Sequence, residues 1–262
     1  MSSGPSNVTL FFRWLLFSFS QFHLEMMRPV QTIQTTGSGN ILVGTAFVIT
    51  ELCVLMIIMA LVKIYSANTD IAVILLFRYW FCLPGLLLLA GRRRGRDLFR
   101  VADAWILVYR CVFGFAGLAT MYIALSLIEI SRYVALNQSS ALIITLLAPF
   151  MLAERVGIRR WVAVIAGFAG VLIILQPGME GWFHRGVAFA LLSPVLHAFM
   201  FIYLRKLGLS TPPETTALIY NVFGACLMSL YCLVSAPVIP AEPLTLLILV
   251  ACGVLSSVQQ VL

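Results

Sequence analysis

The 262-residue chain has little charge. Charged residues make up 10% of it and hydrophobic residues 61%, whereas a soluble domain has roughly 25% charged residues. This shortage excludes an aqueous surface, so the fold must be built for lipid. Only three histidines are present, and the six cysteines fall in apolar runs without CxxC or Cys/His spacing. We therefore expect no metal site, no cofactor and no disulfide. The sequence also contains no phosphate-binding loop and no nucleophile motif, so we do not expect an enzyme.

Long apolar runs recur along the chain. A hydrocarbon core about 30 Å thick needs roughly 20 apolar residues in a helix. The sequence predicts eight such helices, over residues 41–64, 71–90, 103–125, 133–152, 161–176, 186–204, 215–234 and 244–262. The gaps are short and hold glycine and proline breakers, so they leave no room for a soluble domain. The expected fold class is an all-α membrane protein.

Arginine and lysine lie mainly in alternate gaps. The gaps 91–102, 153–160 and 205–214 hold ten of them, and the intervening gaps hold only Arg132 and Arg185. Because positively charged loops stay in the cytoplasm, these three gaps and, by parity, the N-terminus are predicted to be cytoplasmic. The net charge of +7 therefore reflects topology, and a nucleic-acid partner is not expected.

The first 39 residues allow two interpretations. The stretch 8–24 is rich in phenylalanine but contains Arg13, which is typical of a short interfacial helix. Alternatively the true start is Met26 or Met27 and the preceding residues are an over-extended gene start. A cleaved signal peptide is less favoured, because no small-residue cleavage site follows convincingly.

An internal repeat indicates the architecture. Sliding the chain on itself by 142 positions sets Gly44 on Gly186, Ala46-Phe47 on Ala188-Phe189 and Lys63 on Arg205. Five helices separate the two copies, so the second enters the membrane from the opposite side. We therefore expect an inverted repeat, with a five-helix first copy over 41–176 and a three-helix second copy over 186–262.

Several motifs carry a family resemblance. They are Leu76-Phe77-Arg78-Tyr79, Ala148-Pro149, Ala153-Glu154-Arg155, Arg159-Arg160-Trp161 and Gly167-Phe168-Ala169-Gly170-Val171. The chain resembles the EamA-type members of the drug/metabolite transporter superfamily over residues 41–262, although that family usually has glycine where Ala153 stands. The resemblance implies a ten-helix carrier made of two inverted five-helix repeats.

The repeat also implies a length. A complete second copy would run to about residue 318 by the same 142-residue offset, whereas this sequence stops at Leu262. We therefore expect two further helices in the gene. Since both halves of such a carrier form the central site, we expect the 262-residue chain to insert in the membrane without transporting on its own.

Glu51 and Arg78 are the first candidate site residues. They lie about ten and twelve residues from the cytoplasmic ends of their predicted helices, or roughly 15 and 18 Å deep. An ionisable group at this depth costs at least about 2.5 kcal/mol unless it is paired or hydrated. The pair is interpreted either as a substrate or proton site or as a structural salt bridge.

The other candidates are uncharged or lie near a helix end. Tyr133, Asn137 and Ser140 share one face of the predicted fourth helix, with Gln138 beside them, and either line a cavity or bond between helices. His197 is interpreted as a packed neutral side chain or a proton relay, in a helix that Pro194 is able to break. Arg110 is expected to snorkel to the cytoplasmic surface or to pair with Asp103.

These observations favour a secondary carrier in a bacterial inner membrane. It would move a small organic metabolite by alternating access, with proton coupling through Glu51 as one option. The alternative is a non-transporting membrane module, either a sensor or an assembly partner, or an inactive fragment of a carrier. The expected partners are a small-molecule substrate and the lipid bilayer, and a homodimer is left open.

The predicted orientation is testable by cysteine labelling. In a variant without the six native cysteines, a single cysteine in loop 91–102 should be shielded from a membrane-impermeant maleimide added outside intact cells. A cysteine at 179–183 should be labelled. Permeabilised cells, in which both positions should react, provide the control. The opposite pattern in intact cells would contradict the topology.

Overall fold

The computed structural model describes residues 38–94, 101, 103–151, 157–175, 184–208 and 210–261. It divides into two compact units, residues 1–53 with Leu262 and residues 54–261. The predictions for the segment before residue 38 therefore lie outside the described residues. All the packing described below lies within the second unit.

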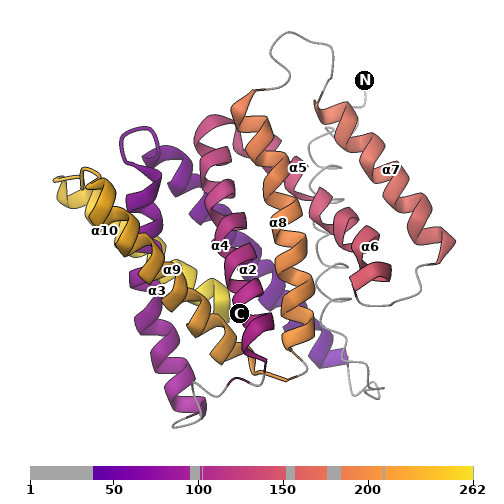
Figure 1. The fold of residues 1–262 in the computed structure, drawn as a ribbon, viewed down its shortest axis with the longest axis horizontal. Coiled ribbons are helices and arrows are strands. Elements are labelled where there is room, and N and C mark those ends of the chain that lie inside the picture. The colour runs from indigo at the N-terminus through magenta and orange to yellow at the C-terminus, as the bar shows by residue number, and fades with distance from the viewer. Residues whose placement is uncertain are drawn as a thin grey trace, which may run out of the picture. The chain divides into compact units, whose positions relative to one another are not determined.

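Within the described residues, all regular secondary structure is helical (Figure 1). The helices are α2 (Ser38–Tyr65), α3 (Ile71–Arg94), α4 (Ala104–Leu127), α5 (Ile130–Asn137), α6 (Ser139–Met151), α7 (Ile158–Leu175), α8 (Arg185–Leu207), α9 (Pro213–Ser235) and α10 (Pro243–Val261). They supply eight spans that are long and apolar enough to cross a membrane, and their ends lie within three residues of the predicted ends. The expectation of an all-α membrane protein is confirmed.

The fourth span, Ile130–Met151, is not the uninterrupted helix that its apolar pattern predicts. α5 ends at Asn137 and α6 begins at Ser139. The Ser139 hydroxyl donates to the carbonyl of Leu136 at 2.7 Å. Because serine and asparagine side chains compete for nearby backbone groups, the polar run 137–140 interrupts the regular helix.

Proline does not have the same effect in α8. This helix runs continuously from Arg185 to Leu207 with Pro194 inside it, so the break that Pro194 is able to cause is not present. α3 and α6 likewise continue past Pro84 and Pro149. The helix break therefore lies at the polar run between α5 and α6. It does not lie at any of these three prolines.

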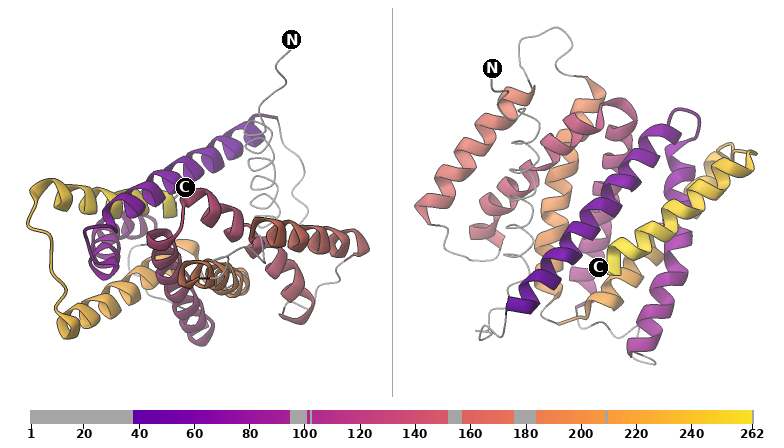
Figure 2. Two further views of the ribbon diagram at one scale, coloured as in Figure 1. Left: turned by 90° about the horizontal axis from the view of Figure 1, so that it is seen from above. Right: turned by 180° about the vertical axis from the view of Figure 1, so that it is seen from behind.

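Two groups of helices pack within the larger unit. α4 packs most extensively along α8, while α3 packs against both α9 and α10, as the two views of Figure 2 show. α9 also contacts α4 and so connects the groups, and α6 joins α8 to α7. Small residues allow close approach at these crossings. The ring of Tyr79 in α3 occupies the space that a side chain on Gly224 in α9 would need.

Polar side chains also join the helices. The amide of Asn221, which is fully buried in α9, donates to Oε1 of Gln260 in α10 at 2.6 Å. Lys63 in α2 donates to the carbonyl oxygen of Ile128 at 2.9 Å, just past the end of α4. A cation at a helix C-terminus complements the partial negative charge there, so Lys63 stabilises the end of α4.

The glycine contacts yield a stability prediction. A Cβ on Gly253 would lie 2.5 Å from the Cβ of Phe81 and 2.8 Å from the carbonyl oxygen of Phe77. Neither atom belongs to a flexible chain end, so Gly253→Ala should cost about 1–3 kcal/mol of stability through overpacking. The measurement is thermal unfolding in detergent.

Gly170→Ala is the matched control. Nothing lies within 4 Å of a Cβ built on Gly170, and alanine is favoured over glycine in a helix by about 0.8–1 kcal/mol. This variant should unfold at the same or a higher temperature than the parent. Equal effects of the two substitutions would contradict the described packing of α3 on α10.

Candidate substrate site

Two buried tyrosines join α3, α4 and α9 in the middle of the larger unit. The hydroxyl oxygens of Tyr79 and Tyr220 lie 3.0 Å apart, and their rings meet edge to face with centroids 5.7 Å apart. The Tyr220 hydroxyl donates to the carbonyl of Gly114 at 3.3 Å. Since a hydroxyl has one proton, Tyr79 is then the donor to Tyr220. The pair holds its rings in a fixed orientation.

Arg78 and Arg110 each lie close to one ring of this tyrosine pair. The Arg78 guanidinium carbon is 5.3 Å from the Tyr79 ring centroid, and that of Arg110 is 4.2 Å from the Tyr220 ring centroid. Arg78 is 6% exposed and Arg110 8%. In both residues, Nε and Nη1 are buried and have no hydrogen-bond partner among the residues the structure describes. Two cations with unused donors therefore share one aromatic cluster.

The expectation for Arg110 is wrong. Instead of snorkelling, its side chain is buried against Tyr220, whereas Asp103 is exposed at the N-cap of α4. A pair between the two is not among the ion pairs recorded for the described part of the chain. The reason is that the packing of α9 on α4 offers the guanidinium an aromatic face, which attracts a cation.

Tyr122 adds a further unpaired group beside Arg78. Its side chain is fully buried, its hydroxyl lies near the Arg78 guanidinium, and it has no hydrogen-bond partner within the described ranges. Hydrogen-bond donors thus outnumber acceptors in this cluster. Chemically, such a cluster is suited to binding a group rich in acceptor oxygens.

A second polar cluster lies where α5, α8 and α4 meet. The Tyr133 hydroxyl is 3.2 Å from Oδ1 of Asn137 and 3.0 Å from the hydroxyl of Ser193. Ser193 in turn lies 3.2 Å from Nδ1 of His197 and 3.3 Å from the carbonyl of Gly117. The structure therefore brings three of the predicted residues, Tyr133, Asn137 and His197, together around Ser193.

The protons of this cluster are coupled. The hydroxyls of Tyr133 and Ser193 carry one proton each, but together they make four polar contacts. A hydroxyl that donates its proton to one partner therefore cannot donate to another. If Ser193 donates to Gly117, then His197 must donate from Nδ1 to satisfy the Ser193 contact. If Ser193 donates to His197, the Gly117 carbonyl loses its donor. The tautomer of His197 and the hydroxyl orientations therefore change together.

Gln138 and Ser140 lie outside these bonds. Both are half-buried, and Nε2 of Gln138 has no partner in the part of the chain that the structure describes. Ser140 follows the break between α5 and α6, where Gln138 keeps right-handed helical backbone angles and donates its N–H to the carbonyl of Val134 at 3.2 Å. That the four polar residues of this span line one cavity stays a prediction.

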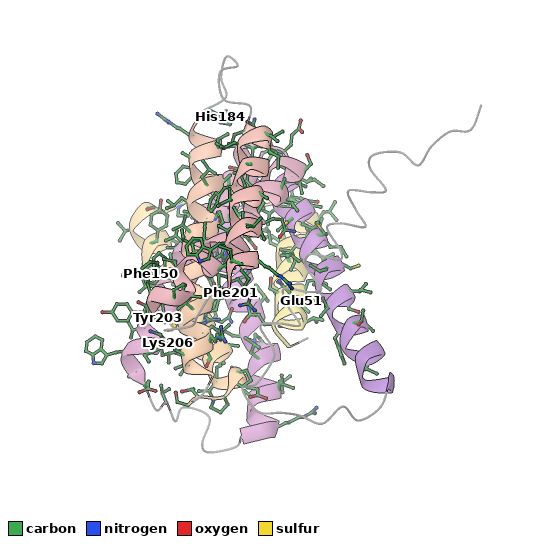
Figure 3. The ribbon with its side chains drawn as sticks, turned by 90° about the vertical axis from the view of Figure 1, so that its right-hand side faces the viewer. Glu51, Phe150, His184, Phe201, Tyr203 and Lys206 are labelled. Carbon is green, nitrogen blue, oxygen red and sulfur yellow. The ribbon has the colours of Figure 1, made fainter. Side chains whose placement is uncertain are left out.

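Glu51 stays a separate candidate. It is half-buried on α2 (Figure 3) and belongs to the first unit, whereas Arg78 belongs to the second. Their pairing therefore stays a prediction.

At the two ends of α8 (Figure 3), His184 accepts from the backbone of Gly186, and Lys206 lies 5.9 Å from the Tyr203 ring centroid.

Eight apolar spans, with charged and polar side chains buried inside the bundle, define a multi-pass helical membrane protein. The model of the EamA-like transporter family matches residues 42–176. The chain belongs to this family, and the resemblance seen in the sequence motifs is confirmed. The matched range covers the five helices predicted as the first repeat.

Three curated bacterial proteins are similar over shorter ranges. A riboflavin transporter of Rhizobium johnstonii is 36% identical over 124 residues, 47% of this chain and 38% of its own length. An S-adenosylmethionine uptake transporter of Rickettsia bellii is 26% identical over 43% of this chain and 38% of its own length. A riboflavin transporter of Vibrio cholerae is 34% identical over 34% of this chain and 29% of its own length. The matches thus span less than half of these relatives.

A solved crystal structure supports the fold alone. It superposes with a TM-score of 0.52 at 18% sequence identity, over 83% of this chain and 78% of the other. At this identity the likeness carries no information about substrate or mechanism. The arrangement of the helices, rather than individual site residues, is what the two proteins share.

The sequence missed four members of the two clusters. From the sequence, Arg110 is expected at the membrane surface or in a pair with Asp103, and none of Tyr122, Tyr220 and Ser193 is a candidate. A polar pair, Tyr220-Asn221, does stand inside the apolar run 215–234. Such a pair in a membrane span indicates a buried contact, and this signal would have pointed to Tyr220.

The coupling between Tyr133 and Ser193 is measurable. In a double-mutant cycle of Tyr133→Phe and Ser193→Ala, unfolding in detergent should give a coupling of about 0.5–1.5 kcal/mol, near the values known for hydrogen bonds between membrane helices. A control cycle pairs Tyr133→Phe with Ser256→Ala, whose hydroxyl bonds the carbonyl of Cys252 in its own helix. That cycle should give no coupling, and equal values in both would contradict the network.

Proposed function

We propose that the protein is a membrane carrier of a small organic metabolite that works by alternating access. Membership of the EamA-like transporter family over residues 42–176 is the observation that carries this proposal. The buried clusters around Tyr79 and Ser193 support it, because polar and charged groups inside a membrane bundle are costly and generally serve a substrate or ion path.

The names of the relatives suggest the first compounds to test. Two are riboflavin transporters and one is an S-adenosylmethionine uptake transporter, and both compounds contain a flat heteroaromatic ring. Aromatic side chains surround the tyrosine pair: Phe115 stacks on Tyr79 at 5.9 Å and meets Phe223 edge to face at 6.3 Å between centroids. Flat rings pack well against such surfaces.

Proton coupling is part of the proposal. Glu51 and the His197–Ser193–Tyr133 chain are the groups that we propose to take up or pass on a proton. The coupled hydrogen bonds around Ser193 support this role, since the tautomer of His197 decides whether the Ser193 hydroxyl donates to His197 or to the carbonyl of Gly117. We further propose a bacterial inner-membrane location with the N-terminus in the cytoplasm, consistent with the bias of basic residues.

Substrate flux separates a carrier from a non-transporting module. Inside-out and right-side-out vesicles carrying the complete gene product should accumulate labelled riboflavin or another member of a metabolite panel, and a proton ionophore should reduce the accumulation. Glu51→Gln should lower flux at least about tenfold, as expected for loss of a charged group worth about 1.4 kcal/mol or more. Flux by no compound in the panel would support the sensor or assembly alternative.

The double variant Glu51→Gln with Arg78→Gln tests the predicted pair. If the pair is structural, each single change leaves an unpaired charge and lowers expression, and the double change restores it. If expression is restored without flux, the pair belongs to the site. Arg92→Gln, at an exposed position in the same helix as Arg78, is the control. Normal flux in all variants would eliminate both interpretations.

A further inference from the structure

The tyrosine cluster contains two buried arginines, and the proposed function gives no role to the second. We infer that Arg78 and Arg110 together bind the acidic group, a carboxylate or a phosphate, of the transported metabolite. This inference rests on the proposed function and deepens it: it names the charge class of the substrate and adds Arg110 as a binding residue. Of the two compounds named above, S-adenosylmethionine has a carboxylate, whereas riboflavin has no acidic group of this kind.

A charged side chain buried in a membrane bundle is costly. A guanidinium stays protonated under all physiological conditions, so neither arginine can escape the cost by losing a proton. The tyrosine rings offset part of it through cation–π attraction. That attraction acts on the face of the guanidinium, whereas the N–H groups lie in its plane. Nε and Nη1 of both residues therefore remain as buried donors without a recorded acceptor among the described residues.

The shape of these donors selects the ligand. In each guanidinium the two unpartnered nitrogens, Nε and Nη1, point from different edges of the group. Each therefore offers an acceptor oxygen a separate charge-assisted N–H, and such hydrogen bonds are roughly twice as strong as those between neutral groups. The Tyr122 hydroxyl beside Arg78 supplies one more donor. An ammonium or sulfonium group at the same place would be repelled by both cations. The cluster thus discriminates by the sign of the charge.

The two arginines lie at different depths. Arg110 is six residues from the start of α4, or about 9 Å, and Arg78 is fourteen residues from Arg92 at the end of the α3 span, or about 21 Å. These two helix ends face the same side of the membrane, because one short loop joins them. Along the helix axes the backbone positions of the two arginines thus differ in depth by roughly 12 Å, while both side chains reach the bonded Tyr79–Tyr220 pair. An anion entering from that side meets Arg110 first.

A stability measurement tests this without requiring flux. The purified 262-residue chain in detergent is unfolded thermally in sodium succinate, sodium phosphate or choline chloride at matched ionic strength. At about ten times the dissociation constant, succinate or phosphate should raise the unfolding temperature by roughly 2–4 °C, and choline should not. Arg110→Met and Arg78→Met should abolish the rise.

The variants also separate a binding role from a structural one. Without added anion, each methionine variant should unfold at the same or a higher temperature than the parent, because an unpaired buried charge has been removed. Arg92→Met, at an exposed position, should keep the anion effect. Arg110→Lys retains the charge without the fork and should keep a smaller rise, so it serves if a methionine variant fails to fold.

Several outcomes would overturn the inference. One is a wild-type chain insensitive to both anions, and another is methionine variants that lose stability but keep the anion effect. An anion effect that arises only in Glu51→Gln would assign the counter-ion to the chain itself. Displacement of succinate by phosphatidylglycerol, dependent on Arg110, would assign the site to a lipid headgroup. Anion-selective binding without flux in the complete gene product would instead contradict the carrier proposal alone.

Discussion

A polar group in the hydrocarbon core must find its partner inside the protein, because lipid offers none. Most of the larger unit follows this constraint. Thr120 and Ser256 donate to carbonyls of their own helices, and Asn221 pairs with Gln260 across α9 and α10. Lys63 donates to carbonyl oxygens at the end of α4. The bonds of Asn221 and Lys63 join different helices, which gain little from the hydrophobic effect once they are in the membrane.

The two candidate clusters meet the constraint in different ways. Around Ser193, hydroxyl, imidazole and amide groups all have a hydrogen-bond partner in the cluster, although the two hydroxyls have fewer protons than contacts. Around Tyr79, two guanidinium groups and the Tyr122 hydroxyl retain donors that no acceptor takes up within the described residues. In the first arrangement the polar groups of the chain serve as each other's partners, whereas in the second several buried donors have no acceptor among the described residues.

Apolar patterning was sufficient to predict the spans, and it was insufficient for the site. The ends of all eight spans lie within three residues of their predicted positions, because helix length in a bilayer is set by its thickness. Tyr133 and Asn137 were correctly placed together, since four residues separate neighbours on one helix face. The contact with Ser193 was not predictable, because it joins helices sixty residues apart in the sequence.

The position of the Arg110 side chain is the clearest example of a feature that the sequence alone does not predict. Its distance from the end of its span is compatible both with snorkelling to the surface and with burial, and no local pattern distinguishes the two. The sequence by itself determined the eight membrane spans of the described residues and the family, because hydropathy and motif residues are properties of the chain. The tertiary structure alone decided that Arg110 and Arg78 share the Tyr79–Tyr220 pair, because the aromatic face that holds Arg110 comes from α9, more than a hundred residues away.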